Sequence, residues 1–179
     1  MKLVILDRDG VINFDSDQYI KSPSEWRPIP GAIEAIARLN QNGYRIAVAT
    51  NQSGIGRGLF DMATLNAMND KMMELVFRQG GRIDALFFCP HTAVEDCNCR
   101  KPRTGMLEEI AARFHTELKG VPSIGDSLKD LQAAEAVGAQ PILVLTGKGT
   151  KTRGEGGMPK KTLVFESLAE ASRYLVAHP

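Results

Sequence analysis

The stretch that decides the fold is Lys2-Leu3-Val4-Ile5-Leu6-Asp7-Arg8-Asp9-Gly10, an apolar run that leads directly into two acidic residues. An uninterrupted apolar run of this length is typical of a strand buried on both faces of a parallel sheet. Such sheets place their chemistry at the carboxyl ends of the strands. Side chains two positions apart in an extended segment point the same way, so Asp7 and Asp9 are predicted to face one crevice. The alternative is a strand that ends in an ordinary polar turn, where Asp is common.

Outward from this strand, apolar runs of strand length alternate with segments of helical periodicity. Asp61 is a plausible N-cap, and Gly138 is placed to close a helix. Further strands are expected at 44–49, 83–88, 123–125 and 141–145, and helices at 32–39, 62–77, 106–118 and 128–137. This alternation predicts an α/β fold: a Rossmann-like, doubly wound parallel sheet with right-handed crossovers and helices on both faces.

The bulk composition indicates an ordinary globular protein. The 179 residues suffice for one domain, 1–179, with a sizeable core. Twenty-two basic residues against 21 acidic ones create no global field that would attract nucleic acid or an anionic membrane. No apolar stretch approaches the roughly 20 residues of a membrane helix, and the first residues do not read as an export signal. We therefore expect a cytoplasmic monomer that acts on a small molecule.

Three segments break the alternation: 13–30, 89–101 and 147–161. The first two follow strand ends, which places them above the carboxyl edge of the sheet, where loops shape ligand sites. The third also follows a strand, but its glycines and lysines favour a mobile surface loop over a wall of the pocket.

A third acidic residue is expected at the same sheet edge. Asp126 ends a short apolar run in Ile124-Gly125-Asp126-Ser127. Two close carboxylates repel each other unless a cation lies between them, and oxygen ligands suit Mg²⁺. Asp7, Asp9 and Asp126 are therefore candidate magnesium ligands. The alternative for the last residue is a helix cap, formed by Asp126 or Ser127.

Phosphate-binding groups follow other strands. Thr50-Asn51-Gln52 comes after the apolar run at 45–49, and its hydroxyl and amides can bind a phosphoryl oxygen. Lys101 adds a point charge suited to the same group. Their alternatives are a turn or helix cap for the first segment and a solvated basic pair for Arg100-Lys101.

All three cysteines of the chain lie in one short segment, as Cys89-Pro90-His91 and Cys97-Asn98-Cys99. Three thiolates and an imidazole form a set suited to tetrahedral Zn²⁺, and no open position is apparent, so the metal is expected to be structural. The alternative is a group of idle thiols beside an unrelated histidine. Because Arg100 and Lys101 follow Cys99 directly, zinc would fix the loop that aims both cations at the pocket. His115 and His178 have no such partners and are expected at the surface.

The strand ends, in the order Asp-x-Asp-Gly, Thr-Asn, Lys-Pro and Gly-Asp-Ser-x-x-Asp, resemble the haloacid dehalogenase superfamily of phosphohydrolases from Lys2 to about Leu145. This resemblance implies a haloacid dehalogenase-like fold, here without a large cap domain. It also implies that Asp7 is the nucleophile that forms an aspartyl-phosphate and that Asp9 is the general acid and base. By the same resemblance, Thr50 and Lys101 hold the transferring group. Mg²⁺ would bind the Asp7 carboxylate, the Asp9 carbonyl and Asp126.

Within the superfamily, the cysteine loop resembles that of the heptose bisphosphate and histidinol-phosphate phosphatases. The loop from Thr50 to Gly58 resembles the heptose form, which implies removal of the 7-phosphate of D-glycero-D-manno-heptose 1,7-bisphosphate on the route to ADP-heptose and the lipopolysaccharide core. Arg57 and Arg100 would bind the second phosphate. The loop 13–19 departs from the family by an extra acidic residue, and Asn13 is a further expected contact there. The residues expected to contact substrate are Asn51, Gln52, Ser53, Arg57, Arg100, Asp15 and Tyr19.

Three alternatives stay open at this point. The first is a histidinol-phosphate phosphatase, although the cations at positions 57 and 100 would repel a cationic amine. The second, from a different class, is a receiver-like phospho-acceptor switch, whose acceptor Asp ends a later strand and has no acid two residues on. The third is an inactive phosphate-binding protein. Turnover of a phosphoester separates the first from the other two.

Overall fold

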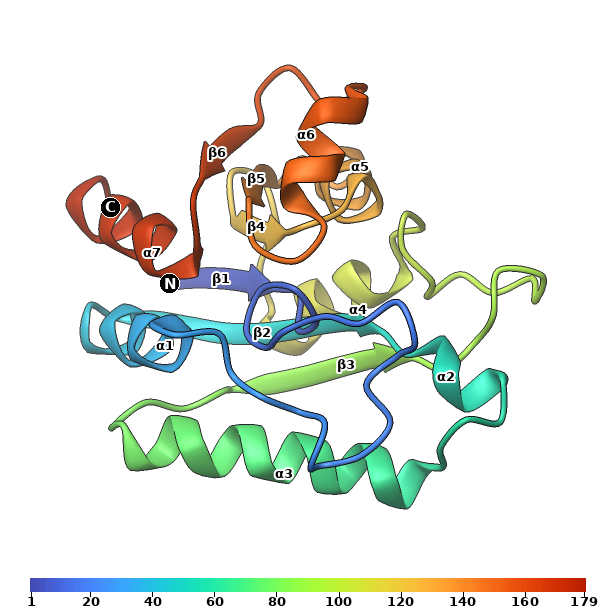
Figure 1. Ribbon diagram of the computed structural model, residues 1–179. Helices are drawn as coiled ribbons and strands as arrows, with labels where there is room; N and C mark the ends of the chain where they lie inside the picture. Colours follow the sequence, from blue (N-terminus) through green and yellow to red (C-terminus); the bar gives the residue numbers. More distant parts are fainter.

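The computed structural model describes all 179 residues and is built on one parallel sheet of six strands (Figure 1). The strand order is β3-β2-β1-β4-β5-β6, so the first strand of the chain lies in the interior of the sheet. All strand pairs are parallel, as the alternation predicted. The strands are β1 (Lys2–Leu6), β2 (Tyr44–Asn51), β3 (Ala85–Cys89), β4 (Pro122–Gly125), β5 (Gln140–Val144) and β6 (Leu163–Phe165).

Helices cover both faces of the sheet (Figure 1). They are α1 (Ala32–Gln41), α2 (Ser53–Gly56), α3 (Met62–Arg78), α4 (Gly105–Phe114), α5 (Leu128–Ala136), α6 (Gly149–Glu155) and α7 (Leu168–Ala177). Buried side chains of α1, α3 and α7 belong to one hydrophobic cluster and those of α4 and α5 to another, which confirms the doubly wound arrangement. None of these helices combines the length and the apolar character that a bilayer crossing requires.

The first strand joins the two cores. Val4 and Leu6 belong to the cluster of 25 buried residues, whereas Leu3 and Ile5 belong to the cluster of 12. Alternate side chains therefore enter opposite faces of the sheet, which explains why the run is apolar at every position. Because β1 is held on both faces and by β2 and β4 at its sides, its carboxyl end is a rigid base for the two aspartates.

Most predicted elements are present, with shifted ends. The strand β2 includes Thr50 and Asn51, which the sequence placed after it. The helix at 106–118 was predicted too long: α4 ends at Phe114 because His115 adopts a left-handed conformation with φ of 50°. The strand at 83–88 begins two residues later than predicted, at Ala85. There the Asp84 carboxylate accepts a hydrogen bond from the Ile46 amide at 2.8 Å.

The segment 147–161 is not the surface loop that the sequence favoured. It contains α6, and Lys148, Lys151, Thr152 and Glu155 line the cavity described below. Its amino end is fixed by hydrogen bonds to the central loops: Thr146 Oγ1 donates to the Gly10 carbonyl at 2.7 Å, and Thr152 Oγ1 donates to the Asp126 carbonyl at 2.8 Å. Local helix propensity did not reveal this, because the bonds are made to residues far away in the sequence.

Candidate active site and metal centres

A cavity of about 440 Å³ opens at the carboxyl ends of the strands and collects the predicted site. The predicted catalytic and magnesium residues all line it: Asp7, Asp9, Thr50, Lys101 and Asp126. The predicted substrate contacts that line it are Asp15, Tyr19, Asn51, Ser53, Arg57 and Arg100. Gln52 and Asn13 do not line it. Both are buried and donate hydrogen bonds to Asp9, so the structure places them behind the acid rather than at the cavity surface.

Lys101 is buried beside the candidate nucleophile. Its Nζ lies 3.1 Å from Asp7 Oδ1 and 2.6 Å from Asp130 Oδ1, and it donates to the Ala49 carbonyl at 2.6 Å. Burial alone would lower the pKa of Lys101, but the carboxylates of Asp130 and Asp7 outweigh it and raise the pKa. The side chain therefore carries a fixed positive charge next to Asp7. Asp130 ends the Gly-Asp-Ser-x-x-Asp motif but has no predicted role of its own, yet it pairs with this cation and forms a capping box with Ser127 at the start of α5.

Three carboxylates converge without enough positive charge to balance them. Oxygen atoms of Asp7, Asp126 and Asp130 lie within 4.8 Å of one another. Burial, followed by the charge of Asp130, raises the pKa of Asp7 well above its ordinary value and that of Asp126 to about 7. A set of hard oxygen donors with excess negative charge fits a divalent cation such as Mg²⁺.

The candidate metal ligand Asp126 is wedged between two glycines. A Cβ at Gly10 would lie 2.0 Å from Asp126 Oδ2, and one at Gly147 would lie 2.3 Å from the same atom. Both glycines also have positive φ, 84° and 55°. The Lys148 amide donates to Oδ2 at 2.8 Å, which leaves the other carboxylate oxygen for a metal. Only glycine permits this approach of backbone to carboxylate.

Metal-free protein should become less stable as pH rises from about 5 to about 8. The pKa values of Asp7 and Asp126 are higher in the folded state than in the unfolded chain, so folding binds protons at these two groups. The stabilisation that comes from this proton binding is lost as the pH rises and both groups ionise. The lowered pKa of Asp9 acts in the opposite direction, but below about pH 4. Thermal unfolding with and without Mg²⁺ checks this: the cation should raise Tm more at high pH, and Asp126→Asn should remove most of both effects. A Mg²⁺-induced increase in Tm that is equal at all pH values would contradict this expectation.

Asp9 is held quite differently from Asp7. Its Oδ1 accepts hydrogen bonds from Arg8 Nε and Asn13 Nδ2, both at 2.9 Å, and its Oδ2 accepts one from Gln52 Nε2 at 3.0 Å. Burial would raise the pKa of Asp9, but the charge of Arg8 and these hydrogen bonds together lower it. Gln52 Nε2 also lies 2.8 Å from Thr50 Oγ1 and so links the acid to the predicted phosphate-binding hydroxyl. The neighbouring carboxyl groups of Asp7 and Asp9 thus have pKa values displaced in opposite directions, because Asp9 accepts hydrogen bonds beside a cation whereas Asp7 is buried beside other acids.

Basic and acidic side chains together line the rest of the cavity. The Arg57 guanidinium lies 5.6 Å from the centre of the Tyr19 ring. Lys148 Nζ lies 3.5 Å from Asp15 Oδ2 and connects α6 to the loop after β1. Burial, followed by the charges of Arg100 and Lys148, lowers the pKa of Lys129. The sequence did not indicate Lys129 or Lys148, since isolated surface lysines carry no motif, but both line the cavity.

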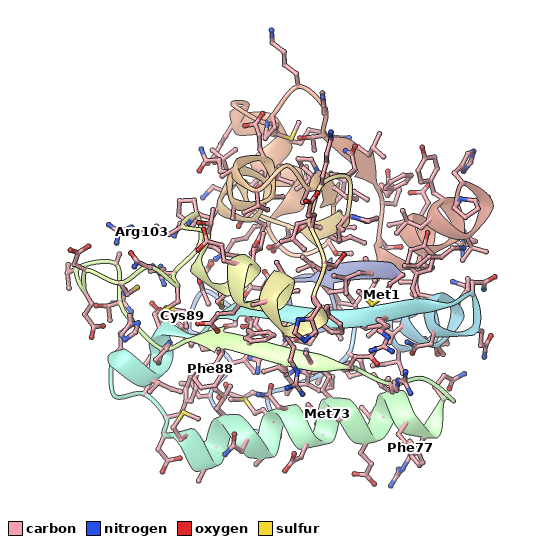
Figure 2. The ribbon with its side chains drawn as sticks, turned by 180° about the vertical axis from the view of Figure 1, so that it is seen from behind. Met1, Met73, Phe77, Phe88, Cys89 and Arg103 are labelled. Atoms are coloured by element: carbon pink, nitrogen blue, oxygen red, sulfur yellow. The ribbon has the colours of Figure 1, made fainter.

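The cysteine loop forms a compact four-ligand group. Cys89 Sγ lies 3.8 Å from Cys97 Sγ, and His91 Nδ1 lies 3.4 Å from Cys89 Sγ and 3.3 Å from Cys99 Sγ. All four ligand atoms lie within 4.8 Å of one another, and this close grouping of three thiols and one imidazole fits a tetrahedral zinc ion. Figure 2 shows Cys89 at the end of β3, with Arg103 on the loop beyond it, at the opposite end of the molecule from Phe77.

Cys97→Ser should not retain zinc and should lower kcat/KM by about 10- to 100-fold, the usual range for a group that orients functional ligands. The reason is that Arg100 and Lys101 follow the ligands directly, so a loosened loop misplaces both cations. Metal analysis should find about one zinc per chain in the parent and none in the variant. Val94→Ser, at the 94% exposed tip of the same loop, is the control and should retain metal and activity. Full zinc retention in Cys97→Ser would contradict the four-ligand assignment.

Two family models match the chain: one described as polynucleotide kinase 3 phosphatase, over residues 2–129, and one described as HAD-hydrolase-like, over residues 98–171. Together with the acid pair at the end of β1, they define the chain as a phosphatase of the haloacid dehalogenase class.

Named relatives of the chain place it in one family within the haloacid dehalogenase class. The chain is 54% identical over 176 residues to D-glycero-beta-D-manno-heptose-1,7-bisphosphate 7-phosphatase of Bordetella bronchiseptica, with 98% of each chain covered. It is 55% identical to the enzyme of that name from Pseudomonas putida, covering 98% of this chain and all of the relative. The chain therefore belongs to the heptose-1,7-bisphosphate 7-phosphatase family.

Solved structures agree with this family. The crystal structure of D,D-heptose 1,7-bisphosphate phosphatase from B. bronchiseptica, complexed with magnesium and phosphate, superimposes with a TM-score of 0.99 at 53% identity and full coverage of both chains. The corresponding protein from Burkholderia thailandensis gives a TM-score of 0.80 at 51% identity, with 99% of each chain covered.

Proposed function

We propose that this protein is a Mg²⁺-dependent phosphoric monoester hydrolase that removes the 7-phosphate of D-glycero-β-D-manno-heptose 1,7-bisphosphate. The observation that carries the proposal is the pairing of Asp7 with the buried Lys101 ammonium at 3.1 Å, beside two further carboxylates suited to a divalent cation. The family membership supplies the substrate, and the relatives are named for the β-anomer.

The proposed reaction uses Asp7 as the nucleophile. One of its carboxylate oxygens bonds to phosphorus as the bond to the oxygen on C7 breaks, and Asp9 gives its proton to that departing oxygen. Water then attacks the aspartyl-phosphate, with Asp9 taking back a proton, and inorganic phosphate leaves. Lys101 and Thr50 hold the equatorial oxygens throughout. Bound Mg²⁺, held by Asp7, the Asp9 carbonyl and Asp126, would supply the positive charge that lets a carboxylate approach a phosphate dianion.

The second phosphate of the substrate is proposed to lie against Arg57 and Arg100, which line the same cavity as Asp7. Arg100→Ala should lower kcat/KM for the bisphosphate by about tenfold or more and leave a monophosphate within about twofold, because a charged hydrogen bond to the second phosphate is lost. Steady-state kinetics with both substrates provides the test. Arg113→Ala, on the exposed face of α4 and away from the cavity, is the control. Equal losses with both substrates would exclude this role for Arg100.

A phosphatase panel tests the substrate assignment. It compares both anomers of the heptose bisphosphate with histidinol phosphate and fructose 1,6-bisphosphate, with Mg²⁺ present. We expect the β-anomer of the heptose compound to have the highest kcat/KM. A preference for histidinol phosphate would overturn the proposed substrate, and absence of turnover for every compound would overturn the phosphatase itself.

We further propose that the chain acts as a single-domain monomer in the cytoplasm, with structural zinc and no nucleic acid or membrane partner. Support comes from the near balance of 22 basic and 21 acidic residues and from three free cysteines that gather for a metal instead of forming disulfides. Its product would feed ADP-heptose synthesis for the lipopolysaccharide core, as the family resemblance implies.

A further inference from the structure

Arg8, the residue between the two aspartates, has no role in the reaction as described so far. Its side chain is fully buried and does not line the cavity. Alternation along the end of β1 turns it away from the face that presents Asp7 and Asp9. A buried guanidinium is costly to desolvate unless it is paired and hydrogen-bonded, so its partners indicate what it is for.

Those partners are one catalytic acid and one helix. Arg8 Nε donates to Asp9 Oδ1 at 2.9 Å, and Nη2 lies 2.9 Å from the same oxygen. On the other side, Nη1 donates to Asn69 Oδ1 at 3.1 Å, and Asn69 is itself buried in the middle of α3. The guanidinium is therefore fixed between a core helix and the carboxylate, and Asp9 is the only acidic residue with which it forms an ion pair.

The two oxygens of Asp9 are consequently unequal. Arg8 and Asn13 occupy Oδ1, whereas Oδ2 accepts a single hydrogen bond, from Gln52. Donors crowded around Oδ1 leave no room for a proton there. Oδ2, which shares the Gln52 amide with Thr50, is therefore the oxygen left to carry and deliver a proton.

We propose that Arg8 and Asn69 are positioning residues that hold Asp9 in the one orientation in which Oδ2 carries the proton toward the leaving oxygen. This inference rests on the proposed function, since it concerns the protonation of the alcohol as its bond to phosphorus breaks. Asn69 acts only through Arg8: it fixes the guanidinium, and the guanidinium fixes the carboxylate.

Phenyl phosphates of graded leaving-group acidity test this. A phenol of low pKa leaves as the phenolate without help, whereas a phenol of high pKa must be protonated as it leaves. A misplaced general acid therefore lowers the rate most for the phenols of high pKa. The quantity to measure is kcat/KM, because it covers only the steps up to release of the phenol and excludes hydrolysis of the aspartyl-phosphate. We expect Asn69→Ala to lower kcat/KM about tenfold for the most basic phenol and less than about twofold for 4-nitrophenyl phosphate, which steepens the Brønsted slope.

Matched variants separate positioning from a general loss of structure. Asn69→Asp keeps the acceptor for Arg8 and should keep the parent slope, and Asn66→Ala, at an exposed position of the same helix, should change nothing. Arg8→Lys keeps the positive charge but lacks the paired N–H donors of the guanidinium, so it should steepen the Brønsted slope as Asn69→Ala does. An equal loss for all phenols, or no loss, in folded Asn69→Ala would overturn the inference. A parent protein that hydrolyses none of them would overturn the proposed function itself.

Discussion

Asp7→Asn should reduce turnover of the bisphosphate by about five orders of magnitude, to the level expected when a covalent nucleophile is removed. The amide cannot bond to phosphorus, and the other groups of the cavity remain in place. The variant should be at least as stable as the parent without metal. The reason is that burial and neighbouring acids raise the pKa of Asp7, so its charge opposes folding at neutral pH. Single-turnover kinetics and thermal unfolding check the two expectations.

A matched control is Asp70→Asn, which changes an exposed acid on α3 and should leave kcat unaltered. Trapping provides a further check on Asp7: acid-quenched parent protein should carry phosphate on residue 7, and the variant should carry none. Turnover of Asp7→Asn near that of the parent would refute the nucleophile assignment.

Lys101→Met should cost both activity and stability. Loss of a preorganised positive charge at the transferring group is expected to lower kcat by about a thousandfold. Because the buried ammonium pairs with Asp7 and Asp130, its removal leaves both carboxylates without their cation, and the free energy of unfolding should fall by about 3 to 5 kcal/mol. Steady-state kinetics measures the first effect, and denaturant unfolding measures the second.

The stability loss in Lys101→Met should depend on pH. Without the cation, which holds the pKa of Asp7 down, Asp7 protonates more readily in the folded state, so the loss should be smaller at about pH 5 than at about pH 8. Lys119→Met, at an exposed position after α4, is the control and should show neither effect. A loss in Lys101→Met that is the same at both pH values would show that the methionine disturbs packing rather than charge balance.

Most chemistry-bearing residues could be predicted from the sequence because they follow apolar strands, and parallel strands bring their ends together at one edge. Asp7 and Asp126 were found in this way, whereas Lys101, in the loop between β3 and α4, was found from the Lys-Pro motif of the family resemblance. Arg8 and Asn69 could not be, because what joins them is a hydrogen bond across 61 positions of the chain. Lys148 was missed for a similar reason: α6 is fixed by bonds to Gly10 and Asp126, and its own residues gave no clear helical signal.

The position of β1 within the sheet determines when the active site can assemble during translation. The ribosome makes the nucleophile's strand before both of its neighbours, and pairing with β2 is possible early, but its other side is covered only by β4, at residues 122–125. Until β4 has emerged, an apolar edge of the future core stays open to other chains. The nascent protein thus carries this open strand edge through much of translation, and Asp7, Lys101 and Asp126 can come together only after the chain has passed residue 126.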